Sequence, residues 1–147
     1  MRLVVQRVRS AAVEADGREA AAIGRGLLVL VGFSAEGEPP ERLARMAERL
    51  VKLRAFDDEA GRINRCLAEV QGALLVVPQV TLTASLEKGS RPSFHTAAAP
   101  ELARSLFEAF VGKLRSLHPD VQTGVFQAAM LVRLENDGPV TFVLEDP

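Results

Sequence analysis

The segment G-L-L-V-L-V-G-F at residues 26–33 decides the fold of this chain. Its central part, residues 27–31, is apolar without interruption. A strand with one solvent-exposed face alternates apolar and polar residues, whereas a strand covered on both faces is apolar throughout. Residues 73–77 form a second run of the same kind. The two runs therefore predict the centre of a β-sheet that has protein on both faces.

Two amphipathic helices are predicted to supply part of that cover. Pro40 and Pro100 each suit the first turn of a helix, where the missing N–H costs nothing. Apolar residues then recur at three- and four-residue spacing, which is the pattern of a helix lying on a core. They are Leu43, Met46, Ala47, Leu50 and Leu53 after Pro40, and Leu102, Leu106, Phe110 and Leu114 after Pro100. We expect the second helix to end near His118, because the residue before a proline disfavours helical geometry.

Shorter strands complete the predicted sheet. They cover residues 3–8, 11–15, 20–23, 121–127, 130–134 and 140–144, with turns at residues 16–17 and 136–139. Residues 57–61 and 83–92 are predicted loops, and residues 62–69 fit no single pattern. Together these elements predict one mixed α/β domain over residues 1–147, with a curled sheet or barrel and two main helices outside it.

Composition excludes several classes of protein. The 147 residues are 48% hydrophobic and 25% charged, which is typical of a soluble globular domain. The apolar runs are far shorter than the roughly 20 residues of a membrane helix. A single cysteine excludes an internal disulfide, and charges near the start argue against a signal peptide, so we expect a cytoplasmic protein. A formal net charge of −1 and the absence of Trp and Tyr argue against an extended phosphate-tracking surface or a platform for several bases.

The sequence contains no orthodox catalytic constellation. His95 lies in a predicted loop, and His118 lies at a helix end, where a histidine commonly complements the helix dipole. Cys66 has no histidine partner in sequence, and no set of His, Cys and carboxylates has metal-ligand spacing. Gly24-Arg25-Gly26 precedes a strand, whereas phosphate-binding loops precede a helix. These patterns favour neither a metal enzyme nor a nucleotide-phosphate binder.

Polar residues do follow one of the buried strands. Pro78-Gln79-Val80-Thr81 comes directly after residues 73–77, and the packing of that strand requires neither Gln nor Thr. Two interpretations stay equally open: these residues form a site, or they merely end the strand. Arg91-Pro92-Ser93-Phe94 is a second unusual loop, with one charge and one aromatic ring.

Six segments resemble the D-aminoacyl-tRNA deacylase family, in order along essentially the whole chain. They are residues 5–13, 23–32, 74–82, 91–94, 123–126 and 136–142. None of them is decisive alone, but their joint order and spacing are specific. The resemblance implies a homodimeric enzyme, without metal or cofactor, that cleaves the ester joining a D-amino acid or glycine to the terminal adenosine of tRNA.

The resemblance also implies roles for particular residues. A Gly-cis-Pro dipeptide that one subunit inserts into the other's site maps to Gly138 and Pro139, with Val140 and Thr141 beside it. The arginine that orients this dipeptide maps to Arg7. The facing catalytic segment maps to Gln79 and Thr81. Residues expected to contact the substrate are Pro78, Val80, Leu82, Arg91, Pro92, Ser93 and Phe94.

The sequence departs from the family pattern at two positions. Pro78 replaces the usual Ser and removes both a hydroxyl and a backbone N–H, and Val80 stands where Phe is common. A proline at this point is similar to a related branch that clears L-alanine from mischarged tRNA, so that activity is one alternative. A non-catalytic dimer that binds RNA ends is another. A small-molecule esterase ranks lower, because no activated nucleophile is visible.

Overall fold

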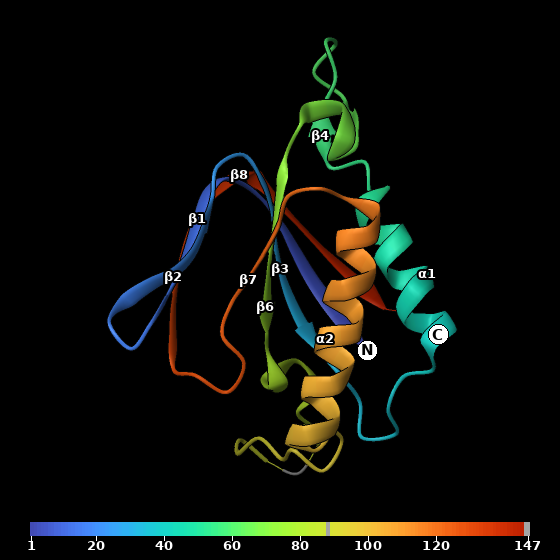
Figure 1. The fold of residues 1–147 in the computed structure, drawn as a ribbon, viewed down its shortest axis with the longest axis vertical. Coiled ribbons are helices and arrows are strands. Elements are labelled where there is room, and N and C mark those ends of the chain that lie inside the picture. Colours follow the sequence, from blue (N-terminus) through green and yellow to red (C-terminus); the bar gives the residue numbers. More distant parts are fainter. Residues whose placement is uncertain (88, 146–147) are drawn as a thin grey trace.

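The computed structural model describes residues 1–87 and 89–145; Lys88, inside the predicted polar loop, and residues 146–147 lie outside the described part. The principal strands and helices follow the sequence expectation closely (Figure 1). The elements are β1 (Arg2–Ala15), β2 (Arg18–Ile23), β3 (Gly26–Gly32), α1 (Pro40–Val51), β4 (Phe56–Asp57), β5 (Ile63–Arg65), η1 (Ala68–Val70), β6 (Ala73–Pro78), η2 (Val80–Thr83), α2 (Pro100–Leu117), β7 (Val121–Thr123) and β8 (Met130–Glu145).

The main sheet has the strand order β2-β1-β3-β6-β7, and β8 pairs with β1. β3, β6 and β7 are mutually parallel, whereas β2, β3 and β8 all run antiparallel to β1. The long strand β1 pairs with β3 through residues 2–8 and with β2 through residues 11–15. β8 pairs with both halves of β1, so the sheet curls into the predicted barrel-like shape.

Two apolar clusters hold the sheet on its two faces, as the uninterrupted strands predict. Leu27, Val29 and Val31 belong to the larger cluster beneath α1 and α2, and Leu28 belongs to the smaller cluster inside the curl. β6 divides in the same way, because successive side chains of a strand point to opposite faces. Figure 1 shows both helices on one side of the sheet. Burying each such Leu or Val side chain contributes roughly 1.5–3 kcal/mol.

The strand β7 is shorter than expected: it ends at Thr123, not near Gln127. Its last partner in β6 is Val76, whose carbonyl accepts the N–H of Gly124 at 2.9 Å. Alternate residues of a strand turn their N–H groups to opposite neighbours, so Pro78 is the next β6 residue facing β7. Proline has no N–H to donate. The hydrogen-bond ladder between β6 and β7 therefore stops at Pro78, and the chain leaves the sheet after β7.

The predicted turn at residues 136–139 does not separate two strands. β8 runs through it in one direction, with Asn136 opposite Val8 and Thr141 opposite Gln6. Arg7 alone lies between the two β1 residues, whereas residues 137–140 lie between their β8 partners. The expected turn is thus a wide bulge in an edge strand, which we call the 137–140 bulge.

A small hairpin, β4–β5, has its turn in the predicted loop at residues 57–61, and its second strand lies in the stretch 62–69 that the sequence pattern left unassigned. Asp58 closes its turn: one carboxylate oxygen accepts the N–H groups of Ala60 at 2.9 Å and Arg62 at 3.0 Å. These backbone hydrogen bonds, that of Arg62 first, lower the pKa of Asp58 below its ordinary value. The carbonyl of Arg65 accepts the N–H of Ala55 at 3.0 Å and fixes the approach to the hairpin.

One carboxylate is buried near the start of α1. Glu38 accepts hydrogen bonds from the Met1 ammonium group, from Arg42 at 3.1 Å and from Ser34 at 3.0 Å. Burial works to raise the pKa of Glu38, but these donors outweigh it and hold the pKa below its ordinary value. Within residues 1–87 and 89–145, none of the helices has the length and apolarity needed to cross a membrane.

Candidate functional site

The first candidate site is the turn at the carboxyl end of β6. Gln79 makes the last ladder contact, donating its N–H to the carbonyl of Val31 at 2.7 Å. The chain then tightens into η2, where the first amide bonded within the turn is that of Leu82, donating to Gln79 at 3.3 Å. The amides of Val80 and Thr81 precede it, and the first amides of such a turn have no partner inside it. Two adjacent N–H groups are therefore available at a strand end.

Contacts with neighbouring segments fix the shape of η2. The Gln79 side-chain amide donates to the Thr81 hydroxyl, and the Thr83 hydroxyl donates to the carbonyl of Val80 at 2.9 Å. Arg2 donates to the carbonyl of Leu82 at 3.0 Å. The closest approach is at Gly32, where an added Cβ would lie 2.9 Å from the Gln79 carbonyl oxygen and 3.0 Å from Leu82 Cβ. Only glycine lets β3 come this close to the turn.

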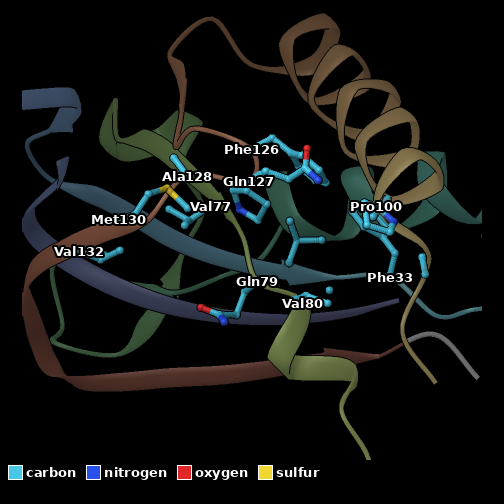
Figure 2. Close-up of a pocket in the computed structure, with 15 residues that line it drawn as sticks. Phe33, Val77, Gln79, Val80, Pro100, Phe126, Gln127, Ala128, Met130 and Val132 are labelled. Carbon is cyan, nitrogen blue, oxygen red and sulfur yellow. The ribbon is translucent and has the colours of Figure 1, made fainter. Parts of the chain in front are cut away.

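A cavity of about 400 Å³ opens beside this turn. Figure 2 shows Gln79 and Val80 on one side of it and Phe126 and Gln127 on the other. The remaining wall is apolar, with contributions from β3, β6, the start of α2 and β8: Val31, Gly32, Phe33, Val77, Pro78, Ala98, Pro100, Ala103, Ala128, Met130 and Val132. Among these described lining residues, none carries a titratable side chain.

Two residues of α2 contact Phe126 and Gln127 and fix their positions in the cavity wall. The ring of Phe126 lies 6.0 Å from that of Phe107, and the Arg104 guanidinium lies 4.8 Å from the Phe126 centroid. The same arginine donates to Gln127 Oε1 at 2.7 Å. An aromatic face and a side-chain amide thus line the cavity in fixed positions. Sequence reasoning did not single out this pair, although residues 123–126 belonged to the family resemblance.

The loop containing Arg91, Pro92, Ser93 and Phe94 lies outside the cavity wall. Ser93 pairs with Ser85 through two backbone hydrogen bonds of 2.8 and 2.9 Å. The loop returns to η2 where the Thr96 hydroxyl donates to the carbonyl of Thr83. Phe94 is 47% exposed, which is unusual for an aromatic side chain with no polar atom. The loop is therefore a neighbour of the turn and presents an aromatic ring to solvent.

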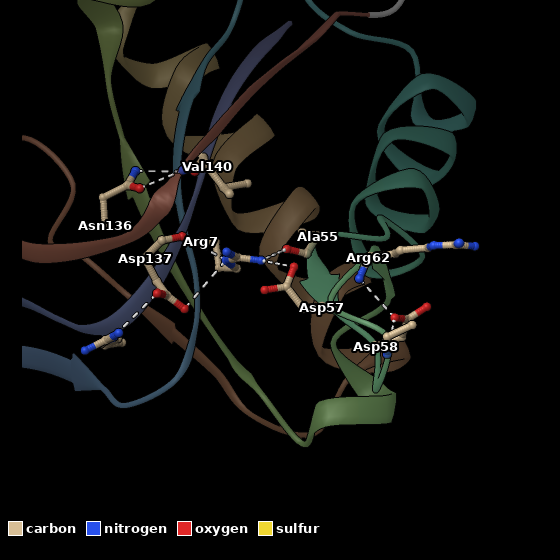
Figure 3. Close-up of polar contacts among 10 residues, drawn as sticks. Arg7, Ala55, Asp57, Asp58, Arg62, Asn136, Asp137 and Val140 are labelled. Atoms are coloured by element: carbon tan, nitrogen blue, oxygen red, sulfur yellow. Dashed lines mark hydrogen bonds and ion pairs between the residues drawn. The ribbon is translucent and has the colours of Figure 1, made fainter.

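The second candidate site is the 137–140 bulge, where the Gly138–Pro139 peptide is cis, as expected. Figure 3 shows Asn136, Asp137 and Val140 of this region close to Arg7. Arg7 Nε donates to the carbonyl of Asp137 at 2.8 Å. Asn136 spans the base of the bulge: its Oδ1 accepts the Val140 N–H at 2.8 Å, and its Nδ2 donates to the Val140 carbonyl at 3.3 Å. Asn136 and Gln6 both donate to the Thr141 hydroxyl at 3.2 Å. Arg7 therefore contacts the bulge as expected, and Asn136 closes it.

The two candidate sites do not meet within one chain. Leu3 of β1 pairs with Val31, which pairs with Pro78, whereas the bulge lies opposite Arg7, four residues further along. That offset alone is roughly 13 Å along the strands. No residue of the bulge lines the cavity beside η2. A single copy of the chain therefore does not bring Gly138 to Thr81.

The histidines have structural partners. His118 is buried, and its Nε2 lies 2.8 Å from the carbonyl oxygen of Gly72. His95 is exposed, with Nδ1 2.8 Å from the Ser93 hydroxyl. Across residues 1–87 and 89–145, no three His, Cys, Asp or Glu side chains form a cluster that could hold a metal ion.

Fold and site together define a small mixed α/β protein with a largely apolar cavity beside a tight turn at a strand end. The chain belongs to the D-Tyr-tRNA(Tyr) deacylase family, whose model matches residues 4–145. It is 51% identical over 147 residues to the D-aminoacyl-tRNA deacylase of Geotalea uraniireducens, covering 100% of this chain and 94% of the relative. It is also 51% identical to that of Teredinibacter turnerae, with 99% of each chain covered.

Solved structures share the fold. One named c-Myc DNA Unwinding Element Binding Protein is 39% identical, with a TM-score of 0.94 and 100% and 99% of the two chains covered. A probable eukaryotic D-amino acid tRNA deacylase superposes with a TM-score of 0.84 at 20% identity, covering 97% of each chain. The second likeness bears on the fold alone.

Proposed function

We propose that this protein hydrolyses the ester bond of D-aminoacyl-tRNA and releases the free D-amino acid and tRNA. The observation that carries the proposal is the pair of amides at Val80 and Thr81 beside a cavity whose described lining has no titratable side chain. Membership of the deacylase family and the names of the 51% identical relatives point to the same substrate.

The chemistry asks little of the side chains. An aminoacyl ester is already activated, so water attacks its carbonyl carbon, the ester C–O bond breaks, and the ribose oxygen takes a proton. The N–H groups of Val80 and Thr81 stabilise the oxyanion that develops, an effect worth roughly 3 kcal/mol per donor. Water or the neighbouring ribose hydroxyl relays the proton. Gln79 holds the Thr81 hydroxyl and thereby the turn.

The cavity suits the terminal adenosine of tRNA. Its volume of about 400 Å³ and its apolar wall match a site that buries a small ligand and fixes it with few polar groups. Phe126 offers an aromatic face for stacking, and Gln127 and Gln79 offer amides. Pro78 and Val80 line the turn side, whereas Leu82 lines a neighbouring hollow. Leu82 and the loop Arg91, Pro92, Ser93 and Phe94 contact the preceding nucleotides. With a net charge of −1, the protein holds only the acceptor end.

A second copy of the chain supplies the chiral filter. The 137–140 bulge lies too far from η2 in its own chain, so Gly138 and Pro139 act in the partner's site, with Val140 and Thr141 beside them. β8 is an edge strand with exposed apolar side chains, including Leu131 at 55% and Val143 at 60% exposure. Such a strand is a template for association. The inserted backbone leaves no room for an L side chain, whereas glycine, including glycine mischarged on tRNA-Ala, passes the filter.

The direct test is hydrolysis of D-Tyr-tRNA, L-Tyr-tRNA and L-Ala-tRNA by the pure, metal-stripped protein, with the oligomeric state measured in parallel. Loss of the D ester with both L esters spared supports a D-specific deacylase. Hydrolysis of L-Ala-tRNA supports the alanine-clearing activity, which is the alternative suggested by Pro78.

A non-catalytic nucleic-acid binder is the remaining alternative, and the name of the 39% identical solved structure favours testing it. Binding of tRNA ends without turnover would support that function. Turnover would exclude it as the whole activity.

A further inference from the structure

Arg7 is a buried cation that joins two segments far apart in the sequence. Its side chain is 8% exposed. Nε donates to the Asp137 carbonyl at 2.8 Å, on the bulge side. Nη1 donates to the Ala55 carbonyl at 3.0 Å and to Asp57 Oδ1 at 3.1 Å, on the hairpin side. Figure 3 shows the guanidinium between the two.

The hairpin side is well anchored. Asp57 is part of β4 and pairs with Ile63 of β5, and the Asp58 turn closes the hairpin. The Ala55 N–H is bonded to Arg65. The acceptors that hold Nη1 therefore belong to a hydrogen-bonded unit that is separate from β8.

A buried guanidinium needs a carboxylate partner, because an uncompensated charge is costly to bury. Arg7 has two: Asp57 at 3.1 Å and the Asp137 carboxylate at 3.7 Å. Asp137 is shared with Arg9, whose Nε lies 3.4 Å away, and it belongs to the bulge itself. Without Asp57, the remaining charge attraction draws Arg7 toward the Asp137 carboxylate and away from the Asp137 carbonyl.

We propose that Asp57 is a positioning residue for substrate selection: it holds the Arg7 guanidinium so that Nε supports the carbonyl at the base of the 137–140 bulge. This inference rests on the proposed function, in which the bulge discriminates D from L substrates in the partner's site. Asp57 touches no substrate; it acts through Arg7.

The test compares Asp57→Ala and Asp57→Asn with Glu59→Gln. Glu59 lies in the same hairpin and forms an ion pair with Arg65 while its own side chain is 93% exposed, so its substitution removes a similar charge without touching Arg7. Each variant is assayed on D-Tyr-tRNA and L-Tyr-tRNA with kcat and KM separated, and its Tm is measured. Loss of one partly exposed ionic hydrogen bond corresponds to about a fivefold change in an equilibrium constant or a rate ratio.

We expect Asp57→Ala to lower the D-to-L ratio of kcat/KM by about that factor, mainly through kcat, with Glu59→Gln within twofold of wild type. Asp57→Asn is nearly isosteric and keeps an acceptor oxygen, so it should fold. Its D-to-L ratio should lie between those of Asp57→Ala and Glu59→Gln. A ratio for both Asp57 variants equal to that of Glu59→Gln overturns the proposal.

A second readout separates failure of this inference from failure of the proposed function. If wild type hydrolyses no D ester, the proposed function fails, and with it the selective role. The contact itself is read from the nitrogen-15 signal of Arg7 Nε–H: faster hydrogen exchange in Asp57→Asn than in Glu59→Gln supports the positioning of Arg7. Equal exchange in the two variants refutes it whatever the activity.

Discussion

Gly32→Ala should disable the η2 turn while leaving the core in place. The new Cβ would lie 2.9 Å from the Gln79 carbonyl oxygen, 3.0 Å from Leu82 Cβ and 3.2 Å from Thr83 Cγ2. All three atoms belong to the turn or to the residue that starts it, and the first is backbone, which cannot rotate away. Ordinary van der Waals separation requires the turn to move by about 0.5 Å.

A displacement of that size matters to catalysis more than to stability. Since a misplacement of about 1 Å can cost 100-fold in rate, a shift of about 0.5 Å should cost on the order of tenfold in kcat. Overpacking should lower the free energy of unfolding by about 1–2 kcal/mol. The matched control is Gly24→Ala, because a Cβ at Gly24 meets nothing within 4 Å.

The assay is single-turnover hydrolysis of D-Tyr-tRNA by wild type and both variants, with urea unfolding for stability. Activity of Gly32→Ala within twofold of Gly24→Ala would refute the claim that the close approach of β3 sets the turn. A large loss of activity in both variants would show that the effect is not specific to η2.

Three further predictions follow from the same geometry. Thr81→Ala should lower kcat less than tenfold, because the backbone N–H survives; complete loss in a folded variant would mean that the hydroxyl is essential. Phe126→Ala should raise KM for D-Tyr-tRNA about tenfold through lost stacking, and an unchanged KM would contradict adenosine binding in the cavity. Glu38 has a pKa held below 4.5 in the folded protein, so its contribution to stability is present above about pH 4.5 and is lost as pH falls through the folded-state value. The stability gap between wild type and Glu38→Gln, from urea unfolding, should therefore shrink between about pH 6 and pH 3; a constant gap would contradict the pKa argument.

Local pattern determined most of the architecture. The uninterrupted apolar runs at residues 27–31 and 73–77 are buried strands, and Pro40 and Pro100 begin the two helices. These features are readable because they depend on neighbours within a few residues: periodicity, proline geometry and turn chemistry. The polar strand end at Gln79 and Thr81 was visible for the same reason.

Sequence alone determined the secondary-structure elements of this protein and the polar residues that end β6. Tertiary structure decided how those parts meet. β7 stops early because Pro78 has no N–H to offer it, and residues 136–139 stay within one strand because β1 pairs with β8 on both sides of them. Phe126 faces Gln79 across the cavity, and Asp57 reaches Asp137 only through Arg7, which lies 50 residues from one and 130 from the other. Contacts over such separations depend on how the whole sheet curls, and no local pattern encodes that.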